Sequence, residues 1–540
     1  MRLGIDFGTT RIVVAAADRG NYPVLQFEST DGGIYDWFPP LVALRGQERR
    51  YGWDAWALQT EPGWTILRSI KRILGDSGPL TQIQYESGSA SLSVILQELT
   101  ASLRRAILET SNLPKDADKL EAQLGVPANA NTNQRFLTAE AFRTGGFEVL
   151  GLLNEPSAAS LEYSHNHPSG TLDERFVLVY DLGGGTFDAS LLSVIGERHE
   201  VLASEGVSTL GGDDFDDILA EMALEAAGVA EADRDALGQT PWFRLREECR
   251  QKKEAIKANS RRIVIDLEPL GMGTAVVSVD EFYERASALV DETMHAVDDA
   301  LERNGFSPDG VRERDGARLE TVYVAGGGSE LPLVPRVLRD RFARRVKRSA
   351  HGRSSTAIGL AVQADGAKNY SLRDRFTRYF GVYREADEGK TVTFDPLFGR
   401  DTQLPAAGEP PLSIERGYTP AHNVGHFRYL ECSKLADDGS PAGDVTLWDE
   451  ILFPLDPALA DVEDLAGRPV VRCPAALEQK IEERYSCDSA GRLAVQIANT
   501  SRGYQRTFRL GRWATSVKTL TPGKRSRRKA ATKKAPKTGG

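Results

Sequence analysis

The sequence predicts an internally duplicated α/β domain over residues 1–368, followed by a smaller β-rich domain over residues 369–516. Three observations predict this organisation. Short β-branched runs alternate with long amphipathic stretches in the first part, one strand–Asp–Gly–Thr pattern occurs there twice, and turn signals replace helical periodicity after residue 368. Residues 517–540 are rich in Lys, Ala, Thr and Pro, so we expect a disordered basic tail.

Charge is unevenly distributed along the 540 residues. The formal net charge is −10, but the segment 524–537 holds eight Lys and Arg residues and no acid, which leaves the remainder at about −18. An acidic body is not typical of a nucleic-acid-binding domain. Only the basic tail is a candidate for contact with nucleic acid, and the alternative is that it only aids solubility.

The four cysteines are widely spaced and form no C-x-x-C pair, which argues against a disulfide scaffold or a zinc site. Asp6 and Arg11 lie where a secretory signal would need an apolar stretch. No segment approaches the ~20 apolar residues that span a bilayer. The sequence therefore predicts a cytoplasmic protein without a membrane partner.

Candidate helices and strands follow one another along the chain. The stretch 92–111 places seven apolar residues on one helical face. The stretch 213–257 is also helix-rich but mostly polar, so we expect it to be mostly exposed. In the second part, residues 481–499 are typical of a hairpin. The candidate strands of the first part are residues 12–16, 176–180, 191–195, 263–267 and 321–325.

The first segment that indicates chemistry is Gly4-Ile5-Asp6-Phe7-Gly8-Thr9-Thr10-Arg11. A strand runs to Asp6, and a turn containing Gly8 and two threonines leads into the next strand. Backbone N–H groups and hydroxyls at such a turn can bind phosphate oxygens. Asp6 can hold hydrated Mg²⁺, because this ion prefers a carboxylate plus waters. The alternative is that Asp6 only shapes the turn.

A second segment, Val179-Tyr180-Asp181-Leu182-Gly183-Gly184-Gly185-Thr186-Phe187-Asp188, repeats this design about 175 residues later. It again combines a strand, a carboxylate, glycines and a threonine. A single match would be chance, whereas two in matching contexts indicate duplication. The repeat predicts a fold that closes on a nucleotide from both sides.

Two further segments complete the set. Gly326-Gly327-Gly328-Ser329 follows an apolar strand and precedes a helix that starts near Leu333. A glycine run there lets backbone lie against a flat nucleoside. Asn154-Glu155-Pro156 opens a helix of small residues, where Glu155 can orient a water molecule.

In this order, the four segments resemble the DnaK-type (seventy-kilodalton heat-shock) chaperone family. The likeness covers about 365 residues and is supported by Ile70-Lys71-Arg72 and by Leu210-Gly211-Gly212-Asp213-Asp214-Phe215-Asp216. Actin-like filament proteins and sugar kinases share the twin hairpins, but Lys71 and the Leu-Gly-Gly run mark chaperones. The resemblance implies a duplicated actin-like ATPase (ribonuclease H-like) domain followed by a smaller β-sandwich domain, with ATP or ADP and Mg²⁺ as cofactors.

The resemblance also implies a role for each site residue. Lys71 positions the γ-phosphate and the attacking water, and the other catalytic residues are Glu155, Asp181 and Thr186. Asp6, Asp181 and Asp188 hold the Mg²⁺ ion through water. The residues implied to bind the nucleotide are Gly8, Thr9, Thr10, Gly183, Gly184, Gly185, Gly211, Gly212, Lys253, Gly326, Gly327, Gly328 and Ser329.

Structural explanations exist for three of these residues. Lys71 and Lys253 can be solvated lysines on helix faces, since Lys253 follows Lys252 directly. Glu155 can be a helix-start residue that the helix dipole favours. The sequence leaves both readings open.

The β-rich part resembles the peptide-binding domain of the same family less closely. Residues 396–405 are similar to its early strands and residues 481–499 to its closing strands, which implies a β-sandwich that holds an extended apolar peptide. Phe427, Tyr429 and Leu430 are candidate groove residues, and the favoured alternative is that they form the sandwich core.

Several features depart from the family. No helical lid is expected after the β-rich part, and residues 364–370 lack the acidic, leucine-rich linker, which argues against interdomain allostery. Gly151 replaces an arginine that serves J-domain partners, which argues against such a partner. Arg250 and Lys257 replace an acid and a serine near the adenine.

Three functions are compatible with these residues. The first is an ATP-dependent chaperone-like protein that hydrolyses ATP slowly and holds unfolded or extended polypeptide clients, with a nucleotide-exchange factor as an implied partner. The second is a nucleotide-switched adaptor that docks one specific partner. The third is an actin-like polymerising scaffold, against which the acidic body and the β-rich part weigh.

Overall fold

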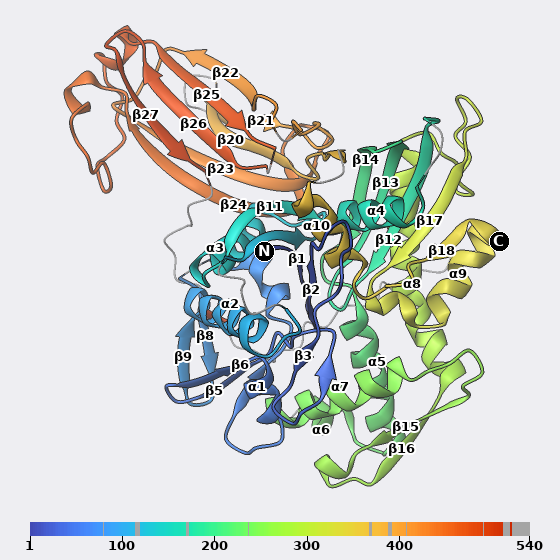
Figure 1. Cartoon of the computed structure of the whole chain (residues 1–540). Helices are drawn as coiled ribbons and strands as arrows, with labels where there is room; N and C mark the ends of the chain where they lie inside the picture. The colour runs from blue at the N-terminus through green and yellow to red at the C-terminus, as the bar shows by residue number, and fades with distance from the viewer. Residues whose placement is uncertain are drawn as a thin grey trace, which may run out of the picture.

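The structure is a computed structural model, and it shows a two-lobed α/β domain with a β-sandwich beside it (Figure 1). The described residues are 1–78, 80–113, 119–168, 172–235, 237–366, 370–386, 391–406, 408–489, 491–510 and 519–520. The basic segment 524–537 lies outside them. Of the predicted tail, only Thr519–Leu520 (β28) is described, and it pairs with β8 (Gln82–Tyr85).

The first lobe, residues 1–154, is built on a four-stranded sheet of order β11-β10-β1-β2. β1 pairs antiparallel with β2 and parallel with β10, which in turn is parallel to β11. The buried face of each strand packs into one core with the apolar face of α2. The elements of this sheet and its helices are β1 (Arg2–Phe7), β2 (Ile12–Ala16), β10 (Glu121–Val126), β11 (Glu148–Asn154), α2 (Leu92–Glu109) and α3 (Thr132–Thr144).

The second lobe, residues 175–348 with the added strand Ser371–Arg373, repeats this topology in the order β18-β17-β12-β13-β14-β19. β12 pairs antiparallel with β13 and parallel with β17, which is parallel to β18. The same pairing pattern in both sheets confirms the duplication that the two hairpins predict. The strands are β12 (Arg175–Leu182), β13 (Phe187–Ile195), β14 (Arg198–Val207), β17 (Leu319–Ala325), β18 (Val346–Arg348) and β19 (Ser371–Arg373).

Two helices join the lobes by packing on the opposite sheet. α4 (Glu155–Asn166) follows the first sheet but packs on β12 and β13, whereas α10 (Ser355–Asp365) follows the second sheet but packs on β1 and β10. The helices touch closely, because a Cβ on Gly359 would lie 1.8 Å from the Ala158 carbonyl oxygen. This crossing fixes the start of α4, where Glu155 lies.

A buried histidine ties α4 to the second sheet and predicts a pH effect. Nδ1 of His199 lies 3.1 Å from the Ser160 hydroxyl, and burial with the nearby Arg175 lowers the pKa of His199 to about 4. The unfolded chain protonates this group near pH 6.5, so the unfolded state binds more protons between pH 6.5 and 4. Acidification through that window should lower the free energy of unfolding by about 3 kcal/mol.

Urea unfolding of the wild type and His199→Gln at pH 7.5 and pH 4.5 measures this effect. The variant lacks the group, so its free energy of unfolding should depend less steeply on pH in this window. Equal pH dependence in the two proteins would contradict the assignment to His199.

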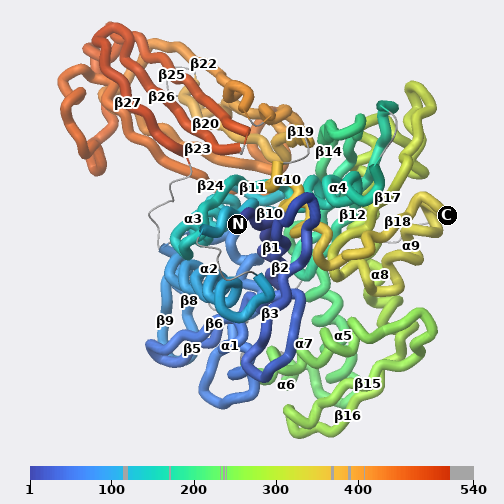
Figure 2. The backbone as a smooth tube through the Cα atoms, viewed as in Figure 1, coloured from blue at the N-terminus to red at the C-terminus, as the bar shows by residue number. Residues whose placement is uncertain are grey.

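The lower part of the second lobe consists of α5, α6, α7 and a small hairpin, and it lies beside α1 of the first lobe (Figure 2). α7 also contacts β7 of that lobe. The expectation that residues 213–257 are mostly exposed is wrong. Asp213, Phe215, Asp216 and Leu219 of α5 are buried. The two aspartates pair with arginines from α7 and from the other lobe, and Phe215 and Leu219 pack in the hydrophobic core of the second lobe. The elements are α5 (Gly212–Ala226), α6 (Glu231–Asp235), α7 (Gln239–Glu254), β15 (Arg262–Asp266), β16 (Thr274–Ser278), α8 (Val279–Glu302) and α9 (Leu333–Phe342), with β5 (Val42–Arg45), β6 (Glu48–Tyr51), α1 (Trp53–Ala57) and β7 (Thr65–Leu67) opposite.

The β-rich part forms two four-stranded sheets with a shared core, which confirms the predicted sandwich. Phe427 and Tyr429 belong to that core and Leu430 is buried, so these three residues are core rather than an open groove. The predicted hairpin 481–499 is β25 paired with β26. The sheets are β21 (Thr391–Phe398), β20 (Tyr379–Ala386), β23 (Val424–Leu435) and β24 (Pro441–Pro454), and β22 (Leu412–Tyr418), β25 (Ile481–Cys487), β26 (Leu493–Asn499) and β27 (Tyr504–Arg509).

The sandwich contacts the first lobe through polar groups. The Glu431 carboxylate accepts hydrogen bonds from Thr132 N and Thr132 Oγ1, both at 3.0 Å, and Thr377 Oγ1 donates to Ala128 O at 2.9 Å. The division of the chain at residue 368 stays a prediction; residues 367–369 are not among the described ones. Within the described chain, no helix combines the length and the apolar character needed to cross a membrane.

Candidate nucleotide site

The two glycine- and threonine-bearing turns face each other across the cleft between the lobes. A Cβ on Gly184 would lie 2.8 Å from Thr10 Oγ1, and one on Gly185 would lie 2.5 Å from Thr9 Oγ1. The glycines therefore permit an approach that side chains would prevent. The turns supply backbone amides and hydroxyls from both lobes to one place.

This contact predicts that Gly185→Ala forces the turns apart. The added methyl group overpacks the contact with Thr9, so we expect the free energy of unfolding to fall by about 1–3 kcal/mol. ADP binding should weaken as well, which calorimetry can measure beside thermal unfolding. Gly183→Ala is the matched control for packing, because its nearest contact, Thr186 O, lies at an ordinary 3.4 Å. Equal melting temperatures for the two variants would contradict the prediction.

A buried ion pair lies below the turns. Nζ of Lys71 donates to Oε1 of Glu155 at 2.5 Å, and the two side chains are 4% and 9% exposed. Lys71 belongs to a 3₁₀ helix, Ile70–Asp76, and Glu155 is the first residue of α4. The reading of Lys71 as a solvated lysine is therefore wrong. Glu155 is a helix-start residue and a partner of Lys71 at once.

Three buried aspartates lie around this pair, and the charges of the pair change the pKa of each of them. Burial and the nearby Glu155 raise the pKa of Asp6 to about 7, although Lys71 lowers it. Burial and the neighbouring carboxylates raise the pKa of Asp181 well above its usual value, and burial with Glu155 raises that of Asp188 to about 7. A buried excess of negative charge suits a divalent cation, which neutralises it.

The cleft brings most of the predicted site residues together. Its cavity volume is about 90 Å³ in this conformation. Predicted residues that line the cleft are Asp6, Gly8, Thr9, Thr10, Lys71, Glu155, Asp181, Gly183, Gly184, Thr186, Gly212, Lys253, Gly326, Gly327 and Gly328.

Four predicted residues lie behind this lining. Gly185 accepts a hydrogen bond from Arg72 Nε through its carbonyl, and Gly211 precedes α5 and has its N–H bonded to Asp214. Ser329 donates to Gly326 O at 2.6 Å. Asp188 is on β13, with the Asn129 N–H 3.4 Å from its carboxylate. These residues support the lining and do not form it.

The third glycine segment lies against the end of β12. Gly326 has a φ of 79°, in the left-handed region, and a Cβ there would lie 2.3 Å from Leu182 O. The segment therefore needs glycine for its conformation and for the close approach. Lys253, predicted to flank the adenosine, donates to Gly212 O at 2.5 Å and lies 2.7 Å from Asp216, so it is not a solvated lysine.

Sequence reasoning placed Arg250 near the adenine but missed the charged residues that gather around it at one end of the cleft. Arg11 Nη2 lies 2.8 Å from Glu254 across the lobes, and Arg353 Nη1 lies 3.1 Å from the same carboxylate. Arg250 is 3.5 Å from Glu254. Arg250 and Glu254 are four residues apart, a spacing that predicts an ion pair on one helix face. No local pattern indicated that Arg11 or Arg353 would contact Glu254.

The duplicated lobes, the facing turns and the sandwich define an actin-like ATPase fold with a β-sandwich domain. The family model described as "Hsp70 protein" matches residues 2–374. The chain belongs to the Hsp70 family.

Similarity to individual chaperone proteins supports this assignment. Chaperone protein HscA of Serratia proteamaculans (strain 568) is 32% identical over 377 residues, which are 67% of this chain and 57% of that protein. A chaperone protein HscA homolog of Colwellia psychrerythraea is 31% identical over 376 residues, which are 67% of this chain and 58% of that protein. The matches thus span less than two thirds of the length of these curated relatives.

Proposed function

We propose that the chain binds ATP with hydrated Mg²⁺ in the cleft, hydrolyses it slowly, and holds unfolded or extended polypeptide clients. The observation that carries this proposal is the buried Lys71–Glu155 pair, which lies among Asp6, Asp181 and Asp188 and faces two glycine–threonine turns. Phosphoryl transfer needs this kind of positioning and charge neutralisation.

Each residue has a distinct part in the proposed reaction. Lys71 donates hydrogen bonds to the γ-phosphate and the attacking water, while Glu155 keeps its ammonium group in place. Thr186 and the turn amides orient the phosphates. Mg²⁺, when bound, supplies positive charge beside the phosphate oxygens.

The metal proposal rests on the donor chemistry of Asp6, Asp181 and Asp188. Among the described residues, no three His, Cys, Asp or Glu side chains converge as an ion site. The carboxylates are therefore proposed to act through coordinated waters, as Mg²⁺ usually retains several.

Single-turnover hydrolysis with ADP affinity measured in parallel tests the proposal. Slow hydrolysis with magnesium-dependent binding is the expected result. A chain that binds no nucleotide would instead be a binding module on an ATPase fold. Pelleting with ATP distinguishes a polymerising scaffold.

A second candidate is a nucleotide-switched adaptor that docks one partner. It is favoured by the burial of Phe427, Tyr429 and Leu430, which removes these three residues as groove candidates. Competition by short apolar peptides separates the two functions, because a general client-binding protein takes many such peptides and an adaptor takes none. A nucleotide-exchange factor, a cytoplasmic location and nucleic-acid contact by the basic tail remain proposals, and a J-domain partner is disfavoured by Gly151.

A further inference from the structure

Lys71 lies between two arginines that reach from the first lobe to the second. Arg68 precedes the 3₁₀ helix Ile70–Asp76, and Arg72 follows Lys71 directly. Both guanidinium groups contact acids at the start of α5. The backbone that carries the lysine is therefore attached to the opposite lobe on both sides of it.

Arg68 is the more deeply buried of the two arginines. Its Nη2 lies 3.0 Å from Asp213 Oδ1 and 3.5 Å from Asp216 Oδ2, and its Nη1 contacts Glu247 of α7. The Arg68 side chain is 6% exposed and that of Asp213 is fully buried. Burial by itself would raise the pKa of Asp213, but Arg68 and two further arginines lower it below its usual value. The contact is thus a charged pair across the lobes.

Ser69 and Arg72 strengthen this attachment. Ser69 has a φ of 59°, which non-glycine residues rarely adopt, and its hydroxyl donates to Asp213 Oδ2 at 2.5 Å. Arg72 Nη2 lies 2.5 Å from Asp214, and its Nε donates to Gly185 O in the turn between β12 and β13. Three residues of the segment, Arg68, Ser69 and Arg72, therefore hold residues 68–72 against the second lobe.

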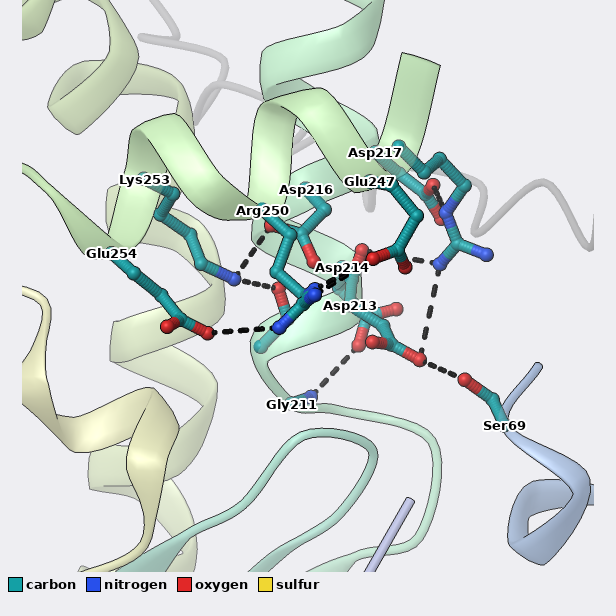
Figure 3. A network of polar contacts seen from close by, with 12 residues as sticks. Ser69, Gly211, Asp213, Asp214, Asp216, Asp217, Glu247, Arg250, Lys253 and Glu254 are labelled. Carbon is teal, nitrogen blue, oxygen red and sulfur yellow. Dashed lines mark hydrogen bonds and ion pairs between the residues drawn. The ribbon is translucent and has the colours of Figure 1, made fainter. Parts of the chain in front are cut away.

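The acids that hold Arg68 also bind cations that line the cleft (Figure 3). Lys253 lies 2.7 Å from Asp216, and Arg250 lies 2.7 Å from Glu247. The figure shows Lys253 reaching Asp216, Arg250 lying between Glu247 and Glu254, and Ser69 beside Asp213. The acids that hold Arg68 and the cations that line the cleft therefore belong to one network of charged contacts.

We propose that Arg68 is a positioning residue, which holds Lys71 in place by binding Asp213, Asp216 and Glu247 across the lobes. Lys71 is then correctly placed only while the lobes are closed at α5. This inference rests on the proposed ATPase function. It adds that the contact between α5 and the segment 68–72 affects the rate of hydrolysis more strongly than it affects the affinity for ATP.

The test compares the full chain with Arg68→Gln and Ser69→Ala. Amide hydrogen exchange in residues 70–76 without nucleotide should rise by at least ~10-fold in Arg68→Gln and less in Ser69→Ala. Single-turnover hydrolysis should slow by about 10–100-fold in Arg68→Gln, because small misplacement of a catalytic group has effects of this size, while the Kd for ATP changes less than about threefold. In the Lys71→Ala background, Arg68→Gln should cause no further slowing, because it acts through that lysine.

Arg246→Gln is the matched control. Arg246 contacts Asp213 and Asp217 from α7, within the second lobe, so this variant removes an arginine from the same acid without touching the first lobe. Equal effects of Arg246→Gln and Arg68→Gln, unchanged exchange in residues 70–76, or further slowing in the Lys71→Ala background would each overturn the inference. A wild type without hydrolysis would refute the proposed function, whereas the exchange comparison would still decide the anchoring.

Discussion

Lys71→Ala should reduce the single-turnover rate of ATP hydrolysis by about 10²–10³-fold while ATP still binds. The ammonium group is held by Glu155 at 2.5 Å, and both side chains are buried in the cleft. Stabilisation of developing charge is strong in such a place, because the group is already oriented and the local dielectric is low. Binding should survive, since the turn amides and threonines also contact phosphate in the proposed site.

The removal of Lys71 also changes the charge of the cleft. Asp6, Glu155, Asp181 and Asp188 then lack their buried cation, so we expect stronger dependence of nucleotide binding on Mg²⁺. Rapid-quench hydrolysis and equilibrium binding, with and without Mg²⁺, measure both effects. Lys252→Ala is the control, because that side chain is 42% exposed and pairs with Glu248 outside the cleft. Hydrolysis by Lys71→Ala at the wild-type rate would remove Lys71 from the mechanism.

Arg384→Met should lower the free energy of unfolding of the sandwich by about 3–5 kcal/mol. Arg384 Nη2 lies 2.8 Å from Glu483, whose side chain is fully buried, and Arg384 Nε lies 2.6 Å from Asp395. The Tyr485 hydroxyl donates to the same glutamate at 2.5 Å. Loss of the arginine leaves a buried carboxylate without a cation, which is far more costly than the loss of a surface pair.

Hydrogen exchange of β25 and β26 at increasing urea concentration measures this loss within the sandwich. Arg484→Met is the control, since Arg484 and Glu415 are 60% and 65% exposed, and it should cost less than about 1 kcal/mol. Arg384→Met combined with Glu483→Gln should recover part of the stability, because the neutral amide removes the unpaired charge. Similar losses for Arg384→Met and Arg484→Met would contradict the prediction.

The sequence alone predicted the features that local pattern encodes. Strand–Asp–Gly–Thr repeats at Asp6 and Asp181 indicated both the duplication and the two-sided cleft, because glycine and threonine at a strand end have a specific use there. Apolar periodicity placed α2 with its buried face, and turn signals placed the hairpin of β25 and β26. Residue chemistry suggested Mg²⁺ for Asp6 and a water for Glu155, the family resemblance implied the roles of Lys71, Asp181 and Asp188, and all of these roles stay proposals.

Only the tertiary structure decided which charged groups are buried together. Arg68 and Asp213 are 145 residues apart, Arg11 and Glu254 are 243 apart, and no local spacing relates either pair. Polar helices such as α5 and α7 were therefore expected to be exposed, although their acids meet arginines from the other lobe. Periodicity reports whether a side chain is apolar, whereas the burial of a charge depends on a distant partner that compensates for its lost hydration. Local pattern therefore predicts the two glycine–threonine turns, whereas only the packing of the lobes shows that Arg68, Ser69 and Arg72 contact the second lobe on both sides of Lys71.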